Sequence, residues 1–209
     1  NSYKNSTSRV RVIRAFGYTP GCMDETACNC NPDADMADGS CIYPELGYDC
    51  DGTQDQVGDY VEGGIIFQIN EDGTGLVSAL EDLPSTYQWG CRGNVTGADG
   101  LAIGTGLQNT LDVSQHDCSK TLTAASEALV YESQGYSDWY LPSKDELVEM
   151  YNTIGYGGPE GNIGGFVKES YWSSSEHGSN GAWYVSFGNV STNYNKKHHS
   201  SRVRVIRAF

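Results

Sequence analysis

Residues 137–155 read SDWYLPSKDELVEMYNTIG and contain the clearest structural signal in the chain. Ser143 can cap a helix, and Glu146, three residues later, completes the capping box that marks a helix start. The apolar positions that follow recur every three or four residues and are Leu147, Met150, Tyr151 and Ile154. This stretch therefore predicts an amphipathic helix with one face on a core.

A strand pair is predicted upstream of this helix, where residues 63–69 (GGIIFQI) and 76–79 (LVSA) flank a Gly-rich turn. Residues 89–110 are also rich in glycine, and they are too broken to predict regular structure. A second helix is expected over residues 121–132. Its apolar side would consist of Leu122, Ala125, Leu129 and Val130.

Another strand is predicted over residues 183–187, because apolar and polar side chains alternate there. The side chains expected to point inward are Trp183, Val185 and Phe187, and those expected to point outward are Tyr184 and Ser186. Two helices combined with a twisted antiparallel sheet make an α+β fold class.

The chain also repeats its own end. Residues 8–16 read SRVRVIRAF, and residues 201–209 read the same nine letters. Apolar residues interleave with arginines in this string, which predicts a half-buried strand. A domain has one place for its last strand. The front copy is therefore either the tail of a preceding tandem repeat or a strand that pairs with a neighbouring subunit. Both interpretations make copies of the chain its expected partners.

Charge is concentrated in one region. Fifteen Asp or Glu and no Lys or Arg lie between Arg14 and Arg92, and the net charge of the chain is −14. Such a field repels nucleic acid and anionic lipid and attracts cations. Nucleic-acid binding is therefore not expected. No apolar run approaches the length that a membrane span requires.

Five of the seven cysteines lie within residues 22–50, a segment with few large apolar side chains. So short a segment needs disulfides or a metal to hold its fold. A Cys-x-Cys spacing with no nearby His disfavours zinc. Disulfides, and with them an extracellular or cell-surface location, are therefore expected. Cys91 and Cys118 flank the Gly-rich region and are expected to form a disulfide there.

The cysteine-rich segment also carries closely spaced carboxylates. Calcium accepts about six to eight oxygen ligands and can hold such groups together in irregular loops. The candidate ligands are Asp33, Asp35, Asp38, Asp49 and Asp51. No Glu closes an EF-hand loop, and aspartates that only cap turns are an equally good interpretation. Calcium is the one cofactor that the sequence suggests.

Residues 21–41, from GC to DGSC, resemble a short repeat (GCxDxxAxNxxPxAxxxDGSC) found between the domains of secreted bacterial surface proteins. The resemblance implies a rigid spacer with a Cys22–Cys41 bridge and with Cys28 paired to Cys50. Cys30 stands where the repeat usually has an aromatic residue, so its partner stays open. We therefore divide the chain into a front strand copied from a preceding repeat (1–16), an acidic Cys-rich spacer (17–59) and an α+β domain (60–209).

A series of motifs occurs in order over residues 60–209: GGIIFQI, WGC with GADGLAIGTGLQNT, SDWYLPSKDELVEMYNTIG, GGF, YWSSSE, AWYVSF and a closing VRVIRAF. In this order they resemble the C-terminal domain family of the Legionella collagen-like adhesin. The resemblance implies a C-type-lectin-like fold, related to formylglycine-generating enzymes and to the variable proteins of diversity-generating retroelements. It implies adhesion and ligand binding as roles, and structural positions for Trp139, Leu141, Trp172 and Trp183.

Tyr, Ser and Asn dominate the stretch before the last strand, and these residues suit adaptable recognition surfaces. The expected ligand face consists of Tyr184, Ser186, Asn189, Ser191, Asn193, Tyr194, Asn195, Lys197 and His198. Candidate N-glycosylation sequons begin at Asn5, Asn94 and Asn189.

Catalysis is not expected. The copper site of formylglycine-generating enzymes uses a cysteine pair toward the C-terminal end of that fold, and no Cys follows residue 118 here. We expect an extracellular structural or adhesive module that assembles end to end into a fibre or stalk. The alternative is a domain that binds a glycan or protein through a variable face, such as a retroelement-diversified receptor-binding protein.

Overall fold

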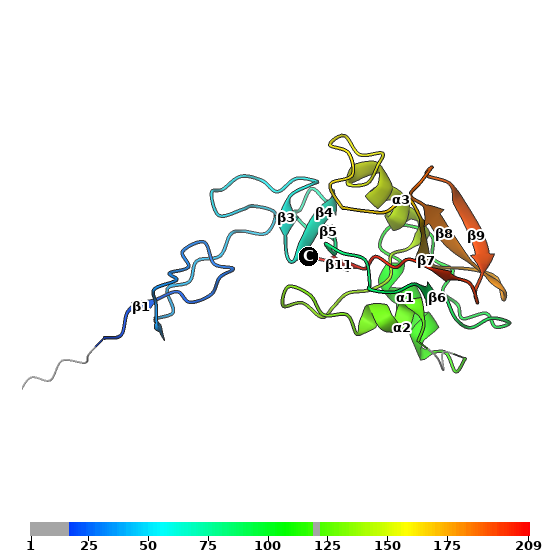
Figure 1. Cartoon of the computed structure of the whole chain (residues 1–209). Coiled ribbons are helices and arrows are strands. Elements are labelled where there is room, and N and C mark those ends of the chain that lie inside the picture. Colours follow the sequence, from blue (N-terminus) through cyan, green and yellow to red (C-terminus); the bar gives the residue numbers. More distant parts are fainter. Residues whose placement is uncertain (1–16, 119–121) are drawn as a thin grey trace, which may run out of the picture. The chain divides into compact units, whose positions relative to one another are not determined.

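A computed structural model of the chain describes residues 17–118 and 122–209. The chain divides into two compact units, whose described residues lie within 17–54 and 55–209 (Figure 1). The predicted front strand (1–16) and the sequon at Asn5 lie outside the described residues. Among those described, no helix has the length and apolarity that a membrane crossing requires.

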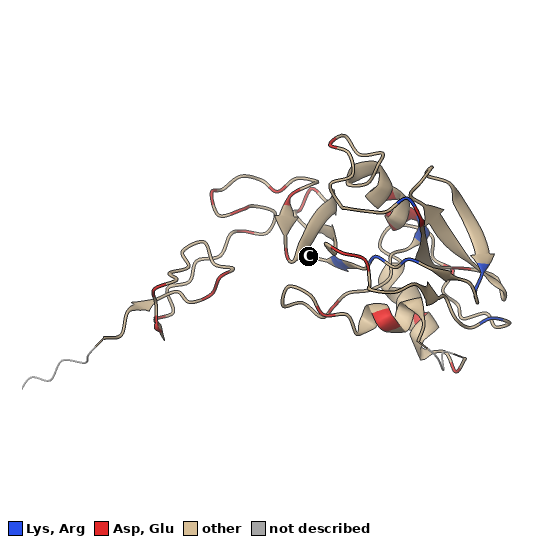
Figure 2. Cartoon of the chain, viewed as in Figure 1, with Lys and Arg blue, Asp and Glu red and all other residues tan. Residues whose placement is uncertain are grey.

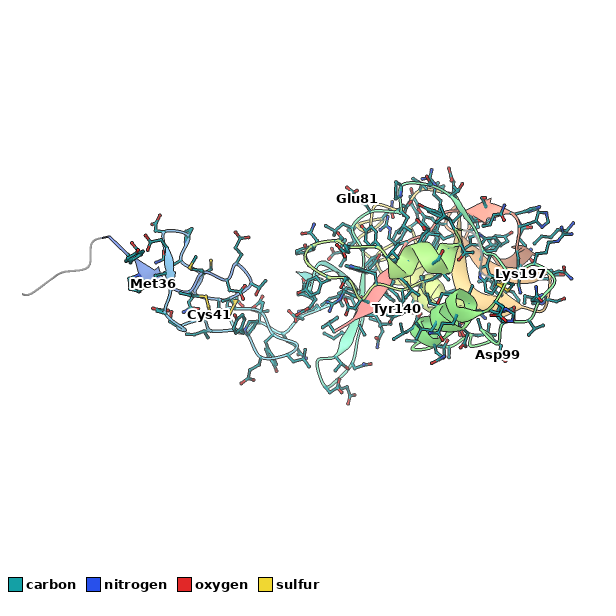
Figure 3. All side chains as sticks on the ribbon, turned by 90° about the horizontal axis from the view of Figure 1, so that it is seen from below. Met36, Cys41, Glu81, Asp99, Tyr140 and Lys197 are labelled. Atoms are coloured by element: carbon teal, nitrogen blue, oxygen red, sulfur yellow. A yellow bond between two sulfur atoms is a disulfide. The ribbon has the colours of Figure 1, made fainter. Side chains whose placement is uncertain are left out.

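The first unit is built from turns and held by two disulfides, which Figure 3 shows near the labelled Cys41. Cys22 is bonded to Cys41 and Cys28 to Cys50, the pairs that the spacer resemblance implies. Its strands are β1 (Pro20–Gly21) and β2 (Met36–Ala37), which pair in parallel. Cys30 is the free thiol. Figure 2 shows no Lys or Arg in the described part of this unit.

A four-stranded antiparallel sheet opens and closes the second unit, with the strand order β11-β5-β4-β3. The predicted strand pair is present as β4 (Gly64–Ile69) and β5 (Gly75–Ser78). β3 (Tyr60–Val61) lies at one edge, and β11 (Ile206–Ala208) lies at the other. The first and last strands of the unit thus share one sheet.

A second antiparallel sheet consists of β7 (Ser170–His177), β8 (Gly181–Ser186) and β9 (Thr192–Lys196), in that order. The short strands β6 (Tyr87–Gln88) and β10 (Ser200–Ser201) pair with each other. Together with the helices, these sheets confirm the α+β fold class.

The best-marked helix, α3 (Lys144–Thr153), begins where the sequence predicts it. Ser143 accepts a hydrogen bond from the backbone of Glu146, and the Glu146 carboxylate accepts one from the backbone of Ser143. Leu147, Met150 and Ile154 are fully buried. The capping box therefore both starts the helix and orients its apolar face.

The Gly-rich segment contains a helix that the sequence analysis missed, α1 (Gly106–Gln115). The expectation of irregular structure over residues 89–110 is therefore wrong at its C-terminal end. A side chain at Gly106 would collide with the Glu146 carboxylate, so this glycine permits close helix packing. The second unit has three helices among its described residues where two were expected.

Helix α2 is shorter than predicted and spans Ala124–Leu129, with Thr123 and Ser126 forming a capping box. Its buried residues are alanines, while Leu122 and Val130 are 72% and 70% exposed. The predicted apolar side is therefore wrong at both ends. A short helix buries small residues here because it packs closely against α1.

Residues 201–209 join the two cores of the second unit. Val203 and Val205 belong to the cluster around Trp89, Trp139 and Trp172, whereas Ile206 belongs to the cluster around Phe67, Phe166 and Phe187. In Figure 1 this red segment runs from the region of β7 to β5. This C-terminal segment thus contributes to both core clusters of the unit.

Candidate functional site

The β7–β8–β9 sheet carries an aromatic cluster, which consists of His177, Trp183 and Tyr194. The rings of His177 and Tyr194 are stacked, with their centroids 3.9 Å apart and their planes at 8°. The Trp183 ring lies edge-on, with its centroid 5.0 Å from that of His177 and 6.1 Å from that of Tyr194. Lys144 Nζ, at the start of α3, lies 5.5 Å from the Trp183 centroid.

Strand register brings the aromatic cluster together. Trp183 is directly opposite Tyr194, and His177 is opposite Gly181. Because Gly181 has no side chain, the His177 ring can reach across β8 to Tyr194. Tyr194 remains 53% exposed. An open depression of about 540 Å³ lies beside it, lined by His177, Ser179, Asn180, Gly181, Tyr194, Asn195 and Lys196.

The structure places most of the predicted ligand face at the surface, but not all of it. The exposed members are Asn189, Ser191, Asn193 and Tyr194, and the half-buried members are Tyr184, Ser186, Asn195 and His198. Tyr184 points toward the core, where its ring contacts Trp172 edge-on. Lys197 is completely buried, so its assignment to the ligand face is wrong.

Trp183 departs from its expected inward position. Val185 and Phe187 are fully buried, as are the family-matched residues Trp139, Leu141 and Trp172, but Trp183 is only half-buried. Phe187 packs against Tyr151 of α3, whereas the contact of Trp183 with α3 is with Lys144 at the helix start. The helix therefore leaves part of the indole uncovered, and this part joins the aromatic cluster.

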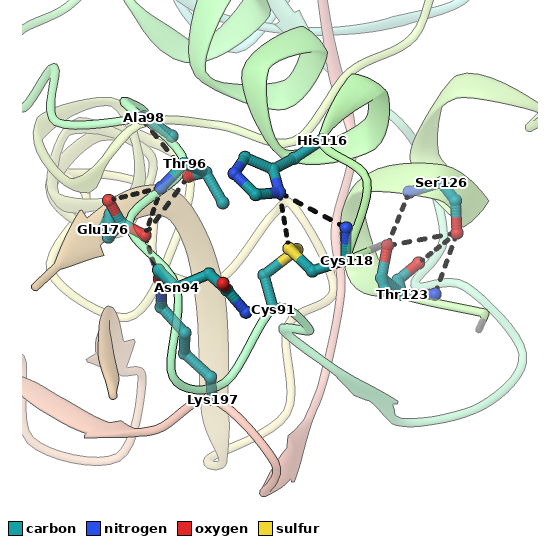
Figure 4. Close-up of a disulfide and its surroundings, with 10 residues drawn as sticks. All are labelled: Cys91, Asn94, Thr96, Ala98, His116, Cys118, Thr123, Ser126, Glu176 and Lys197. Atoms are coloured by element: carbon teal, nitrogen blue, oxygen red, sulfur yellow. Dashed lines mark hydrogen bonds and ion pairs between the residues drawn. A yellow bond between two sulfur atoms is a disulfide. The ribbon is translucent and has the colours of Figure 1, made fainter. Parts of the chain in front are cut away.

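Lys197 forms a buried ion pair with Glu176 (Figure 4). Lys197 Nζ also donates to the carbonyl of Asn94 at 2.7 Å and lies 4.6 Å from the Trp89 ring centroid. The backbone N–H of Thr96 donates to both oxygens of Glu176, at 3.0 and 3.1 Å. Burial lowers the pKa of Lys197, and the hydrogen bond with Glu176 opposes this shift. This pair fixes the loop around residues 94–98 against the end of β9.

Cys91 and Cys118 are bonded, as predicted from the sequence, and the disulfide closes the loop that contains α1. His116 lies beside it, with Nδ1 2.8 Å from Cys118 Sγ (Figure 4). Within the described ranges, these three residues are the one group of His, Cys, Asp or Glu side chains whose possible metal-ligand atoms all lie within 4.8 Å of one another. With the disulfide closed, its sulfurs are not thiolates, the form in which cysteine binds metals.

Four of the five aspartates proposed as calcium ligands accept backbone hydrogen bonds through their carboxylates, whereas for Asp33 the backbone N–H donates to Asn31 Oδ1 at 3.1 Å. Asp35 accepts from the backbone of Thr19 at 2.6 Å, and Asp38 accepts from that of Ser40 at 2.9 Å. Asp49 and Asp51 both accept from the backbone N–H of Thr53, at 3.0 and 2.9 Å. Calcium binding by this unit stays a prediction. The sequon residues Asn94 and Asn189 are exposed.

Two arginines of the last segment are buried in specific pockets. Arg204 is 1% exposed; its Nε is 2.8 Å from Asp82 Oδ1, and its Nη1 donates to the carbonyls of Ala79 and Gly164. Arg207 Nε is 2.7 Å from Asp138 Oδ1 and its guanidinium lies 3.9 Å from the Tyr136 ring centroid. The prediction of a half-buried strand is therefore wrong in two respects: beyond Ser201 only Ile206–Ala208 form a strand, and Arg204 and Arg207 are buried like the apolar side chains. Arg202 is the least buried of the three arginines, and it pairs with Glu169, whose side chain is 56% exposed.

Sequence reasoning missed the aromatic cluster and the arginine pockets. His177 and Trp183 come from different strands, so register alone brings them to Tyr194. Asp82 and Asp138 are far from Arg204 and Arg207 in sequence. The excess of arginine in an otherwise apolar string was the one available signal, because buried arginine requires carboxylate or carbonyl partners.

These features define the second unit as an α+β module with a disulfide-braced loop and an exposed aromatic cluster. The family model of the Lcl C-terminal domain matches residues 79–207, and the chain belongs to this family. The resemblance drawn from the sequence motifs is thereby confirmed.

The chain is also similar to a solved fimbrial protein from Bacteroides ovatus. The two share 14% sequence identity at a TM-score of 0.50, and the match covers 83% of this chain and 50% of the fimbrial protein. The chain thus spans about half the length of that protein, and the likeness concerns the fold alone. No curated protein matches the chain.

Proposed function

We propose that the chain is an extracellular structural and adhesive module that joins copies of itself end to end into a fibre or surface stalk. The observation that carries this proposal is the repeat of residues 201–209 at residues 8–16. The three disulfides fit an oxidising location. Membership of the Lcl C-terminal domain family and a fold shared with a fimbrial protein are compatible with this role.

The proposal assigns the second unit a C-type-lectin-like fold and a structural role in place of a catalytic one. Its first and last strands share one sheet, and helices pack around a second antiparallel sheet. Such a unit has its two ends anchored in the same sheet, which suits a module that passes load along a chain.

The test is the state of assembly of the purified full chain. Light scattering coupled to size exclusion should show species whose mass rises with chain concentration, and electron microscopy should show linear particles. Monomers at every concentration, in the presence and absence of calcium, would contradict the proposal. Calcium is included because the acidic first unit is its candidate binding region.

The aromatic cluster favours a second function, binding of a glycan or protein on the β7–β8–β9 sheet. A sugar ring can stack its C–H face on an exposed aromatic side chain, and the amides of Asn180 and Asn195 line the adjacent depression. An exposed face of this kind would also suit a retroelement-diversified receptor-binding protein.

A glycan and surface-protein array tests this second function. Tyr194→Ala should remove the array signal, whereas Tyr60→Ala should leave it unchanged. Tyr60 is a matched control because it is 55% exposed, against 53% for Tyr194, and lies on β3. Equal signals from both variants would place any binding elsewhere.

A further inference from the structure

Residues 201–209 occupy a slot that is assembled from many parts of the second unit. Their backbone bonds reach β7 at Ser170 and Trp172, the segment at Leu83 and Ala79, Tyr140, and Gly75 of β5. Val203, Val205 and Ile206 are fully buried in the two cores. Asp82, Asp138 and Glu62 supply the carboxylates that meet the arginines. We call this set of contacts the tail slot.

The tail slot selects a particular sequence. It requires apolar side chains at the positions of Val203, Val205 and Ile206, and arginines at those of Arg204 and Arg207. An arginine at the Arg204 position needs the Asp82 carboxylate and two carbonyls at distances of 2.8 to 2.9 Å. A generic strand would take the guanidinium away from these acceptors and leave the Asp82 carboxylate without its cation, which is costly.

Residues 8–16 meet every one of these requirements. Arg11 corresponds to Arg204, Ile13 to Ile206 and Arg14 to Arg207, with identical residues between them. Identical side chains at identical spacing can make the same contacts in the same slot. We propose that residues 8–16 occupy the tail slot of a second copy of the chain, in place of that copy's own residues 201–209. The inference rests on the proposed function and specifies the contact through which one copy would join the next.

The free edge of β9 is a less suitable acceptor for residues 8–16. Its residues Thr192–Lys196 (TNYNK) offer no carboxylate to Arg11 or Arg14, and Lys196 would repel them. The tail slot provides three carboxylates and two apolar cores. Charge complementarity therefore favours the slot.

Each copy's own tail competes for the same slot. A covalently attached segment acts at an effective concentration of about a millimolar, so at equal contact energy the own tail wins in dilute solution. Exchange between copies should therefore increase with chain concentration, and most when chains fold together. When unfolded chains are refolded at a series of concentrations, residues 8–16 and residues 201–209 compete for slots that neither segment yet occupies.

A cysteine pair can report which segment fills the slot. Ala208 is directly opposite Leu76. The next pair along the two strands, Phe209 and Gly75, exchanges backbone hydrogen bonds. Because such pairs alternate in an antiparallel sheet, Ala208 and Leu76 form a pair without backbone hydrogen bonds between them. Side chains at such a position without its own hydrogen bonds are close together, which suits a disulfide. Ala15 is the residue of the front copy that corresponds to Ala208.

The experiment uses the full chain with Cys30→Ser, unfolded in denaturant without reductant, refolded at rising concentration and then mildly oxidised. The double variant Ala15→Cys/Leu76→Cys should give a ladder of disulfide-linked chains on non-reducing gels, with a yield that rises with concentration. The control Leu76→Cys/Ala208→Cys should close within single chains, which also shows that Leu76→Cys still folds.

Two further variants separate the slot from nonspecific association. Arg11→Ala in the ladder-forming chain should reduce the yield by about a hundredfold, because the Asp82 carboxylate loses its buried partner. Arg9→Ala should keep the yield, because its counterpart Arg202 forms a largely exposed ion pair. Equal effects of the two variants would overturn the proposal.

A chain that stays monomeric at all concentrations, while the Leu76→Cys/Ala208→Cys control closes, would also overturn it. Light scattering on the same samples distinguishes a failure of the slot assignment from a failure of the proposed function. Assemblies without a ladder would leave end-to-end joining intact and make only the slot assignment wrong. The absence of both assemblies and ladder would contradict the proposed function as well.

Discussion

The two units of the chain keep their folds by different means. The first unit has two disulfides, and Cys22 and Ala27 are its only buried apolar side chains within the described residues. The second unit has two core clusters and one disulfide on a loop. A disulfide acts mainly by restricting the unfolded chain, whereas a core acts through burial of apolar surface. Covalent links thus replace a core where acidic residues and turns leave little to bury.

The largest expected effect comes from opening the disulfides of the first unit. Cys22→Ser/Cys41→Ser should unfold this unit completely, because no core remains to hold it. Cys91→Ser/Cys118→Ser should leave the second unit folded and reduce its free energy of unfolding by about 3 to 4 kcal/mol. Hydrogen exchange on the full chain reads both units. If the amides of the first unit stay protected from exchange in the Cys22→Ser/Cys41→Ser variant, the first unit does not depend on this disulfide for its fold.

A buried arginine should matter almost as much to the second unit. Arg204→Ala leaves the Asp82 carboxylate without its ion-pair partner, so we expect a loss of about 3 to 5 kcal/mol in the free energy of unfolding. Arg202→Ala removes a largely exposed pair with Glu169 and should cost about 0 to 1 kcal/mol. Urea unfolding followed by tryptophan fluorescence measures both. Equal losses would mean that the tail slot is not selective.

The Lys197–Glu176 pair should have a smaller effect. Lys197→Met leaves Glu176 buried without a cation, but the carboxylate can take up a proton, so we expect a loss of about 2 to 3 kcal/mol. The neighbouring Lys196 is exposed, and Lys196→Met should be neutral. Adding Glu176→Gln to Lys197→Met should recover part of the loss. No recovery in this double-variant cycle would mean that Lys197 acts through packing alone.

The smallest effect is a dependence on pH. The hydrogen bond from Arg207 holds the pKa of Asp138 below its ordinary value of 3.8. A carboxyl with a lower pKa in the folded state stabilises the fold above its ordinary pKa and loses this contribution as the pH falls through the folded-state value. The second unit should therefore lose stability below pH 3.8.

Asp138→Asn removes this contribution and serves as the control. The difference in unfolding free energy between the unmodified chain and the variant should shrink as the pH falls below 3.8, the ordinary value. Denaturant titrations above and below that pH measure it. A difference that stays constant across this range would assign the effect of Asp138 to packing.

The sequence predicts local structure well where one segment decides the outcome. The capping box of Ser143 and Glu146 fixes the start of α3, and two apolar runs around a Gly-rich turn predict β4 and β5. Helix α1 escapes prediction because the reason for its glycine start is the close approach of the Glu146 carboxylate, which lies far away in sequence. The burial of Lys197 could not be predicted, because its ion-pair partner Glu176 lies far away in sequence and the surrounding residues are polar.

The candidate site is the least predictable part for the same reason. Tyr194 could be chosen from its composition, but His177 and Trp183 join it only through the register of three strands. Residues 201–209 show the opposite case. Their importance follows from repetition in the sequence, whereas the two arginine pockets follow only from the fold.

The position of residues 201–209 also sets the time at which the second unit can close. Chains are synthesised from the N-terminus, and β5 must wait for β11, the last strand of the unit, before its sheet is complete. Until residues 203–206 have left the ribosome, both core clusters lack the apolar side chains that this segment contributes. The packing of the second unit can therefore be completed only after this segment has been synthesised and has left the ribosome.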